Sequence, residues 1–460
     1  MKFTRFIGTS RNPLYQAALR SGAVRKMDLR PTAGNITLDF VLDGQPFALP
    51  MAPVVRDLVD LAAMVYVADE LLLRNDAPDH WSRTFDAVIP VRSPAAWRRA
   101  TPQLAEALHF LSGDTFQFEW VLTKIVPKLR NHRAQIPDGF DTVCLFSGGA
   151  DSLVGAFELL EAGRHVLLVG HQAEGITSST QDRVFEFFKK RFGDRVSFVQ
   201  ARVGRSPRPS PEFNLGKKVE VTHRPRSFLF LALAVALASA VDVDEILIPE
   251  NGLIAINPPL NISRAGTLST RTAHPRFIAG FTSFVAKAGI FDGRIHNPFM
   301  YLSKTDVVRR APRALRSMFR KTLSCSHLGR NRWVKFSGYH CGYCVPCLYR
   351  RVALSTIGLD DPQDYFRSVF TRFGDLSAND RADVTALASF ATRVSRMSTA
   401  QRIATAISHG ACDSETLAAV GPAVDDPYAA WSDMLLRWSE EFLQTARGWA
   451  SRDVRRRLNL

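Results

Sequence analysis

The feature that most constrains the fold of this chain is the turn Ser147-Gly148-Gly149-Ala150-Asp151-Ser152. It follows a run of strand-forming residues, 142–146, and precedes a helical pattern with Leu153 and Phe157 on one face. A strand that ends in two glycines and restarts as a helix leaves unpaired backbone N–H groups directed at one point, with the helix dipole behind them. The sequence therefore predicts an anion cradle between a strand and a helix.

Asp151 stands inside this cradle, where its carboxylate would repel phosphate groups. A hard cation between them removes the repulsion, so the combination predicts Mg²⁺-bound pyrophosphate rather than a bare anion. The hydroxyls of Ser147 and Ser152 supply further donors. A glycine turn alone is often only a packing solution, but the full Ser-Gly-Gly-x-Asp-Ser pattern resembles the pyrophosphate loop of the N-type ATP pyrophosphatases. That resemblance implies that ATP is split between its α and β phosphates.

Length and composition indicate an ordinary globular protein. A chain of 460 residues should hold two or three domains, and 46% hydrophobic with 22% charged residues is typical of such proteins. The longest apolar run, 228–241, suits a buried helix, and no sustained apolar segment follows Met1. Six cysteines, four of them in one short window, indicate a metal site in a reducing compartment. We therefore expect a cytoplasmic protein without a membrane segment.

The formal charge of +15 is compatible with nucleic-acid binding, in which Lys and Arg neutralise phosphates. The charges are scattered, however, with local concentrations at Arg309-Arg310, Arg316–Lys321 and Arg455–Arg457. No basic stripe interleaved with aromatic residues is present in the sequence. Because ATP and an acidic partner would use the same surplus, nucleic-acid binding stays an alternative that is not favoured.

The residue patterns divide the chain into four predicted parts. Residues 1–136 have the pattern of an α+β accessory domain that opens with a hairpin around Asp43-Gly44. Residues 137–324 alternate strand and helix patterns, which predicts an α/β domain with a doubly wound parallel sheet and ligands at the carboxyl ends of its strands. A zinc-binding segment, 325–361, and a helical region, 362–460, follow.

The expected element boundaries place two motifs at strand ends. Ser147–Ser152 and Gly170-His171-Gln172 both follow predicted strands, so the two segments should converge on one crevice. Arg202–Pro211 has the composition of a mobile loop. The predicted strands are 35–40, 46–49, 85–91, 115–121, 142–146, 165–169, 196–200 and 245–248, and the predicted helices are 54–73, 94–111, 151–162, 180–192, 226–240, 386–394 and 430–449.

The cysteine cluster predicts a metal centre. Cys341, Cys344 and Cys347 place three thiols in seven residues, and Cys325 lies sixteen positions upstream of the first. This spacing fits a closed tetrahedral Cys₄ zinc site of the structural type. An iron–sulfur cluster is the alternative, but zinc is the simpler reading for a site with no redox partner in view. His327 or His340 could replace one ligand, although the four thiols complete the site by themselves.

Taken in chain order, these motifs resemble 7-cyano-7-deazaguanine synthase, the queuosine-pathway enzyme, over roughly residues 142–355. Gly170-His171-Gln172 stands where that family has Tyr-Gly-Gln, and Pro225-Arg226-Ser227 lies near its Gly-Arg-Asn. Several ordered matches over two hundred residues are far more specific than any one motif. The other segments that carry the resemblance are Ser147–Ser152, Asn297–Lys304, Thr322–Cys325 and Cys341–Arg350.

The resemblance implies an adenylation mechanism. The carboxylate of 7-carboxy-7-deazaguanine attacks the α-phosphorus of ATP and expels pyrophosphate, and an amine then displaces AMP. Because no protein nucleophile is needed, the chain must align the reactants and neutralise phosphate charge. The resemblance assigns Asp151 to Mg²⁺ and Lys304 to the phosphates, both as catalytic residues. It further implies ATP or pyrophosphate contacts at Ser147, Gly148, Gly149, Asp151, Ser152, Gln172 and Lys304, and substrate contacts at Arg226 and Asn251.

The chain also departs from this family. Free-standing synthases are about half as long, and their Tyr-Pro-Asp-Cys-Arg substrate signature is replaced here by Arg271-Thr272-Ala273-His274. Residues 257–272 look lengthened and rewritten. Large relatives of this kind resemble the synthase-like components of bacterial anti-phage defence systems, above all the Qat system and secondly type IV CBASS. That resemblance implies transfer of the deazaguanine acyl group to the N-terminal amine of a partner protein encoded nearby.

Four functions are therefore weighed. The first is an ATP-dependent enzyme that joins a deazaguanine carboxylate to a protein amine, and the second is a synthase that makes the free nitrile. The third is a nucleic-acid base-modifying enzyme. The fourth is a catalytically silent zinc scaffold, against which the intact loop, Asp151 and Lys304 argue.

Overall fold

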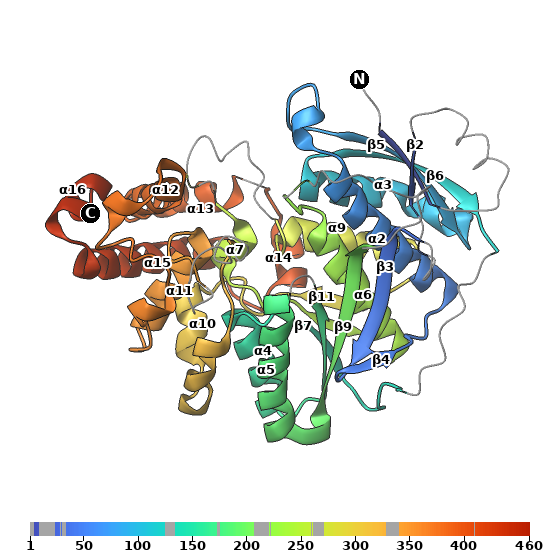
Figure 1. The fold of residues 1–460 in the computed structure, drawn as a ribbon, viewed down its shortest axis with the longest axis horizontal. Coiled ribbons are helices and arrows are strands. Elements are labelled where there is room, and N and C mark those ends of the chain that lie inside the picture. Colours follow the sequence, from blue (N-terminus) through green and yellow to red (C-terminus); the bar gives the residue numbers. More distant parts are fainter. Residues whose placement is uncertain are drawn as a thin grey trace.

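The computed structural model describes residues 4–8, 24–27, 29, 34–124, 134–172, 175–206, 220, 222–258, 260, 271–327, 340–408 and 410–460. This part of the chain forms a mixed α/β structure with two sheets and many helices (Figure 1). The predicted mobile loop Arg202–Pro211 and the lengthened segment 257–272 lie partly outside the described residues. The loop prediction is wrong for residues 202–205, which belong to a β-strand, Val196–Arg205, and pair with strand Ile36–Leu42.

The larger sheet has seven strands in the order β11-β10-β7-β8-β9-β3-β4. The five strands from β11 to β9 are parallel, whereas β3 pairs antiparallel with β9 and β4 antiparallel with β3. A mostly parallel α/β sheet is thus confirmed. Its strands are β3 (Ile36–Leu42), β4 (Gln45–Phe47), β7 (Thr142–Leu145), β8 (Val166–His171), β9 (Val196–Arg205), β10 (Glu245–Leu247) and β11 (Arg294–His296).

The order of the strands reverses at β7. From β7 the chain adds β8 and β9 on one side and then places β10 and β11 on the other. The loops that leave β7 and β10 therefore diverge at the carboxyl edge of the sheet, which is where open α/β sheets bind ligands. The turn Ser147–Ser152 leaves the sheet at this switch point.

Both faces of this sheet are buried. Val143 and Leu167 pack into one hydrophobic cluster, whereas their neighbours Cys144 and Leu168 pack into a second cluster, because successive side chains of a strand point to opposite faces. The second face is covered by α4 (Ala150–Glu161) and α5 (Gly175–Phe192), and the first by α2 (Pro53–Leu71), α6 (Arg226–Ala240) and α9 (Pro275–Lys287).

Helix α6 contains most of the long apolar run of the sequence. Its residues from Leu231 to Ala238 are all buried, because it lies between the sheet and α2. Among the described residues no helix combines the length and the apolar character that a bilayer crossing requires.

The smaller sheet consists of four parallel strands in the order β2-β1-β5-β6. Helix α3 connects its last two strands and also packs on α9, which joins this sheet to the layers of the larger one (Figure 1). The elements are β1 (Thr4–Gly8), β2 (Val24–Met27), the 3₁₀ helix η1 (Arg74–Asp76), β5 (Thr84–Val91), α3 (Pro94–Ser112) and β6 (Thr115–Leu122).

The predicted hairpin around Asp43-Gly44 is present, and both turn residues have positive φ angles, 47° and 84°, as a two-residue hairpin turn requires. It does not belong to the smaller sheet, however. Its strand β3 pairs with β9 along the whole of Ile36–Leu42, so part of residues 1–136 extends the larger sheet. The boundaries of the four predicted parts stay predictions.

Most of the C-terminal helices gather at one end of the molecule, opposite the smaller sheet, whereas α14 lies near the middle and packs on α9 and β11 (Figure 1). The predicted helices 386–394 and 430–449 lie within α12 and α15, respectively. The remaining elements are α7 (Gly252–Ile256), α10 (Lys304–Arg310), η4 (Arg313–Lys321), α11 (Val345–Ser355), η6 (Pro362–Asp364), η7 (Phe373–Asp375), α12 (Ala378–Val394), α13 (Thr399–Ile407), α14 (Ser414–Val420), α15 (Pro427–Trp449), α16 (Arg452–Leu458) and η2 (Gly193–Arg195).

Candidate active site and metal centre

The turn between β7 and α4 is a glycine-dependent loop. Gly148 has a φ of +76°, in the left-handed region that side chains disfavour, and Gly149 is the N-cap residue of α4. A Cβ at Gly148 would lie 3.2 Å from Cγ of Gln181 and 3.3 Å from Cγ2 of Thr180, both on α5. The loop is therefore pressed against α5 with its backbone at the start of α4, in the strand–turn–helix arrangement that the sequence predicts.

The hydroxyl groups of the two serines of the loop lie close to one another. The Oγ atoms of Ser147 and Ser152 are 3.3 Å apart, and the backbone N–H of Gly149 donates to Oγ of Ser147 over 3.3 Å. Ser152 in turn donates its hydroxyl to the carbonyl oxygen of Gly149. Because Ser147 is exposed, its hydroxyl is available to a ligand at the helix N-terminus.

Asp151 lies in the first turn of α4 and is only 4% exposed. Its Oδ2 atom accepts hydrogen bonds from Nζ of Lys304 over 2.9 Å and from Nδ2 of Asn251 over 2.8 Å. Lys304 is the first residue of α10, and the capping box formed by Ser303 and Asp306 fixes the start of that helix. The structure thus brings together both predicted catalytic residues and one predicted substrate residue.

Glu250 is a member of this cluster that we did not predict from the sequence. It follows β10 at the switch point, and Nδ2 of Asn251 donates both to its Oε1 over 3.1 Å and to Asp151. Asn251 is itself held as the N-cap of α7, where its Oδ1 accepts from the backbone N–H of Ile254. The sequence signal that could have identified Glu250 is an acidic residue shortly after a strand at the switch point of the sheet.

The pKa values of Asp151 and Glu250 are shifted in opposite directions. Burial and the neighbouring Asp151 carboxylate raise the pKa of Glu250 well above its usual value. Burial also acts to raise the pKa of Asp151, but the Lys304 ammonium and hydrogen bonds outweigh it, so the pKa of Asp151 is lowered. With both acids ionised, two negative charges would face a single ammonium group.

These two carboxylates fit a magnesium ion. The Oδ1 atom of Asp151 is buried and has no hydrogen-bond partner among the described residues, and the neighbouring Glu250 carboxylate would supply a second oxygen ligand. Mg²⁺ commonly takes one or two protein carboxylates together with substrate phosphates. Asp151 and Glu250 are therefore the residues that would hold the ion next to the loop.

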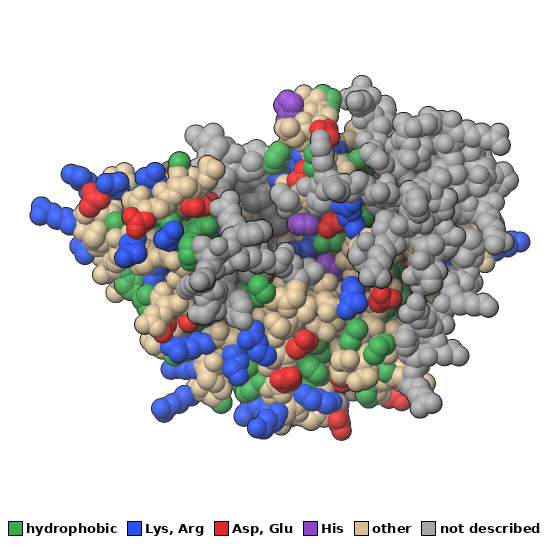
Figure 2. Space-filling model, in the orientation of Figure 1, with side chains coloured by type: hydrophobic (Ala, Val, Ile, Leu, Met, Phe, Trp, Pro, Cys, Tyr) green, Lys and Arg blue, Asp and Glu red, His purple; other side chains and the backbone are tan. Residues whose placement is uncertain are grey.

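The two remaining predicted ligand residues lie at the same edge of the sheet but outside this cluster. Gln172 follows β8, and its Oε1 accepts a hydrogen bond from Nε of Arg202 over 3.2 Å. Arg226 is the first residue of α6, is exposed, and lies 5.4 Å from the ring of Phe230. Among the described residues neither side chain has a hydrogen bond to Asp151. On the face of the molecule that Figure 2 draws, histidine, basic and acidic side chains gather in a hollow near the middle.

His171, the residue before Gln172, is a structural side chain. It is buried against the ring of Tyr66, 5.4 Å away in an edge-on arrangement, and its Nε2 lies 2.8 Å from the carbonyl oxygen of Val203. Burial lowers the pKa of His171 to about 4, so the ring is neutral at physiological pH and Nε2–H donates to that carbonyl.

The four predicted metal ligands converge. Cys325, Cys341, Cys344 and Cys347 are all buried, and their Sγ atoms lie within 4.8 Å of one another. Zinc–sulfur bonds of about 2.3 Å in a tetrahedron require sulfur–sulfur distances of about 3.8 Å. The Sγ atoms of Cys341 and Cys347 are 3.8 Å apart, so the cluster has the dimensions of a closed zinc site.

The two histidines near this cluster have different positions. Nε2 of His340 accepts a hydrogen bond from the backbone N–H of Ser324 over 3.2 Å, so this ring nitrogen is already occupied and is not free to bind a metal ion. Nδ1 of His327 lies 3.8 Å from Sγ of Cys341, at the rim of the cluster. The set of four thiols is complete without either ring.

The four-cysteine cluster is linked by a hydrogen bond to the Ser147–Ser152 loop. The backbone N–H of Leu323, two residues before Cys325, donates to the carbonyl oxygen of Gly148 over 3.1 Å. Arg350, buried on α11, donates to Oγ1 of Thr322 over 2.7 Å and so holds the same segment from the other side. A metal ion that fixes Cys325 would therefore also fix one wall of the loop.

A comparison with protein families matches residues 272–358 to a family described as "Queuosine biosynthesis protein QueC". This stretch contains Lys304 and all four cysteines of the metal centre. It ends before α12 and begins after the Ser147–Ser152 loop.

Several curated relatives are named 7-cyano-7-deazaguanine synthase. The protein of Methanoculleus marisnigri is 27% identical over 240 residues, which cover 49% of this chain and 98% of the relative. The "7-cyano-7-deazaguanine synthase 1" of Mesorhizobium japonicum is 34% identical over 93 residues, 20% of this chain and 36% of that protein. The protein of Xanthomonas euvesicatoria is 29% identical over 157 residues, 33% and 61% of the two chains. Together these matches support the synthase family for part of the chain.

The relatives leave much of this chain unmatched, and the chain spans only 36% and 61% of the length of two of them. Among solved structures, a ketoreductase domain from the bacillaene assembly line aligns with 65% of this chain and 80% of its own, at a TM-score of 0.24 and 8% identity. That similarity is too low for any inference about fold or function.

Proposed function

We propose that this protein activates the carboxylate of 7-carboxy-7-deazaguanine with ATP and passes the acyl group to an amine. The observation that carries the proposal is the contact of Lys304 with Asp151 inside the Ser147–Ser152 loop, at the switch point of the sheet. The match to the QueC family and the relatives named 7-cyano-7-deazaguanine synthase support this substrate class.

In the first step a carboxylate oxygen of the substrate attacks the α-phosphorus of ATP and the bond to pyrophosphate breaks. The leaving pyrophosphate carries negative charge, for which the chain offers the backbone N–H groups at the start of α4, the hydroxyl of Ser147 and the ammonium of Lys304. A magnesium ion held by Asp151 and Glu250 would neutralise phosphate charge at the same edge.

In the second step the amine nitrogen attacks the acyl carbon, and the bond to the AMP oxygen breaks. The chain's part in this step is positional, because holding two reactants in the right geometry removes most of the entropic barrier. The identity of the amine acceptor distinguishes the two candidate functions, protein modification and nitrile synthesis. Ammonia leads to an amide and, after a second activation, to the nitrile that the relatives' names describe.

We favour a protein amine as the acceptor, in an anti-phage role with a partner protein encoded nearby. Two departures from the synthases support this preference. The substrate signature is replaced by Arg271-Thr272-Ala273-His274, and about half of the chain lies outside the match to the relative that is covered almost completely.

The test is a reaction of the full-length protein with ATP, Mg²⁺ and 7-carboxy-7-deazaguanine, with and without the products of the neighbouring genes. We expect substrate-dependent pyrophosphate release that Asp151→Asn abolishes, with an unchanged far-ultraviolet circular dichroism spectrum. Mass spectrometry then separates amide, nitrile and modified protein. Release of pyrophosphate by Asp151→Asn at the wild-type rate would contradict the assignment, and salt-sensitive binding to tRNA or DNA would favour the nucleic-acid alternative instead.

A further inference from the structure

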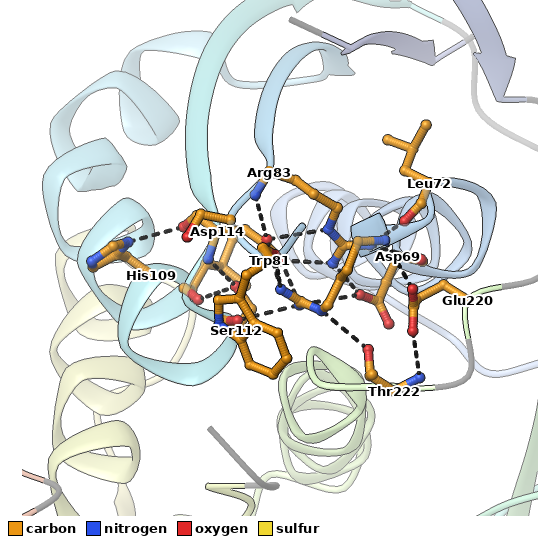
Figure 3. Close-up of polar contacts among 12 residues, drawn as sticks. Asp69, Leu72, Trp81, Arg83, His109, Ser112, Asp114, Glu220 and Thr222 are labelled. Carbon is orange, nitrogen blue, oxygen red and sulfur yellow. Dashed lines mark hydrogen bonds and ion pairs between the residues drawn. The ribbon is translucent and has the colours of Figure 1, made fainter. Parts of the chain in front are cut away.

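A second cluster of buried charges lies between the smaller sheet and α2 and includes no residue of the Ser147–Ser152 loop (Figure 3). Arg83 bonds Asp69 over 2.5 Å and Asp114 over 2.7 Å, and Arg74 bonds Asp114 over 2.9 Å. All four side chains are more than nine-tenths buried. Two aspartates and two arginines therefore pair with one another in this network, although Oδ2 of Asp69 has no hydrogen-bond partner among the described residues.

A third buried arginine stands beside this network without joining it. Arg224 is 5% exposed, and its guanidinium carbon lies 4.3 Å from the centre of the Trp81 ring. On the same ring system Arg74 lies at 5.5 Å. The Nε and Nη1 atoms of Arg224 are buried and have no hydrogen-bond partner among the residues that the structure describes.

The other buried arginines of the described chain show how unusual this is. Each of them donates at least two hydrogen bonds from its guanidinium group to a carboxylate, a hydroxyl or a carbonyl oxygen. They are Arg74, Arg83, Arg350, Arg351 and Arg402. In Arg224, by contrast, two of the three guanidinium nitrogens have no hydrogen-bond partner in the described part of the chain, and the guanidinium lies over the face of Trp81.

The electrostatic environment of Arg224 points the same way. Burial, together with the nearby Arg74, lowers the pKa of its guanidinium to about 9, although Asp114 and Asp69 partly offset this effect. Those two aspartates are already paired with Arg74 and Arg83. A buried cation that lacks a partner is costly unless a counter-charge is supplied.

The backbone holds Arg224 in this position. The preceding residue, His223, has a φ of +45°, in the left-handed region, and the following residue, Pro225, is the N-cap of α6. Helix α6 begins at the carboxyl edge of the larger sheet, because it leads from β9 back to the start of β10. Its fifteen residues add the positive end of a helix dipole to the charge of Arg224.

We infer that Arg224 is a receptor for an oxyanion, a carboxylate or phosphate group of a small ligand bound at the start of α6. The guanidinium lies over the ring of Trp81, and its Nε and Nη1 atoms, which have no hydrogen-bond partner among the described residues, are the donors that a carboxylate or phosphate group would engage. The site needs both Trp81, from the part of the chain that precedes the Ser147–Ser152 loop, and the turn before α6.

The test measures binding of three probes to the full-length protein by calorimetry at constant ionic strength: inorganic phosphate, ATP and 7-carboxy-7-deazaguanine. We expect Arg224→Gln to weaken binding of at least one probe about 10- to 100-fold, the effect of losing a charge-assisted hydrogen bond. Selective loss of phosphate and ATP binding identifies a phosphate site, and selective loss of 7-carboxy-7-deazaguanine binding identifies a carboxylate site.

Arg402→Gln is the matched control. This arginine is equally buried, but its guanidinium already donates to Ser432 and Thr399, so all three probes should bind the variant as they bind the wild type. Wild-type affinity of Arg224→Gln for every probe would overturn the inference. If that variant does not fold, Arg224→Lys is used instead, because it keeps the charge and replaces the planar guanidinium by an ammonium group. Its affinities for the three probes are then compared with those of the wild type in the same way.

The inference does not rest on the proposed reaction. Asp151→Asn should lose pyrophosphate release and keep wild-type binding at Arg224, because the two residues share no contact among the described ones. If 7-carboxy-7-deazaguanine proves not to be a substrate, the phosphate and ATP titrations still test Arg224.

Discussion

The buried pair of Asp151 and Lys304 allows a quantitative test of the site. Lys304→Met removes the only ammonium group that contacts Asp151 in the described chain and keeps a side chain of similar length. The side chains of the pair are 5% and 10% exposed, so the carboxylate would lose its counter-charge with little access to water. Breaking such a pair by removing one partner costs about 3–5 kcal/mol.

The sign of the effect follows from the pKa of Asp151. Because Lys304 lowers this pKa in the folded state, the carboxylate stabilises the fold above its unfolded pKa, near 3.9, and that stabilisation is lost as the pH falls through the folded value. In Lys304→Met the ammonium no longer offsets burial, which raises the pKa of Asp151, so the buried carboxylate contributes less to the stability of the fold at pH 7. For a cooperative unit of about 150–250 residues, a loss of about 3 kcal/mol lowers Tm by about 6–12 °C.

The assay is a double-mutant cycle with Asp151→Asn, followed by urea unfolding at pH 7. Replacing both charged groups removes the unpaired charge, so the double variant should be more stable than Lys304→Met, with a coupling energy of at least about 2 kcal/mol. The pair Arg310–Glu158, 2.7 Å apart and 51% and 32% exposed, is the control and should give about 0–1 kcal/mol. A coupling energy for Asp151–Lys304 no larger than that of the control would refute the reasoning.

Three further results are expected. Cys344→Ser/Cys347→Ser should lose zinc in metal analysis and slow pyrophosphate release, because Leu323 ties the centre to Gly148, whereas Cys412→Ser should keep its zinc. Burial holds the pKa of His171 near 4, so the wild type should lose up to about 1.4 kcal/mol of stability per pH unit as the pH falls from about 6.5 to 4, relative to His171→Gln. The same dependence of unfolding free energy on pH in both proteins would contradict this. Glu250→Gln should weaken Mn²⁺ binding in the presence of ATP about tenfold by electron paramagnetic resonance, and Glu158→Gln should not.

Local patterns in the sequence predicted most elements of the larger sheet. The strand–glycine–helix pattern at Ser147–Ser152 and the apolar run of α6 are both present where the residues indicate them. The errors are at ends that depend on tertiary partners. Strand β9 was expected to end at residue 200 but continues to Arg205, because β3, some 160 residues earlier in the chain, supplies a hydrogen-bonding partner for the extra residues. Nothing local to 201–205 carries that information.

The site shows the same division. The four cysteines were identified from spacing, because metal ligands close together in sequence leave few geometries open. Glu250 was missed, because its role depends on the switch point between β7 and β10, which only the strand order reveals. Arg224 was missed for a similar reason: one arginine among many gains significance only when its guanidinium is buried without a partner.

The position of the hairpin changes how the extra N-terminal region should be tested. From the sequence, deletion of residues 1–136 could separate adenylation from transfer to a partner protein. In the structure β3 pairs with β9 and α2 packs on α6, so the deletion would strip one edge of the larger sheet and expose the buried face of α6. An unpaired strand edge and an uncovered apolar helix both favour aggregation. The contribution of this region to function is therefore better measured by single changes at its surface than by truncation.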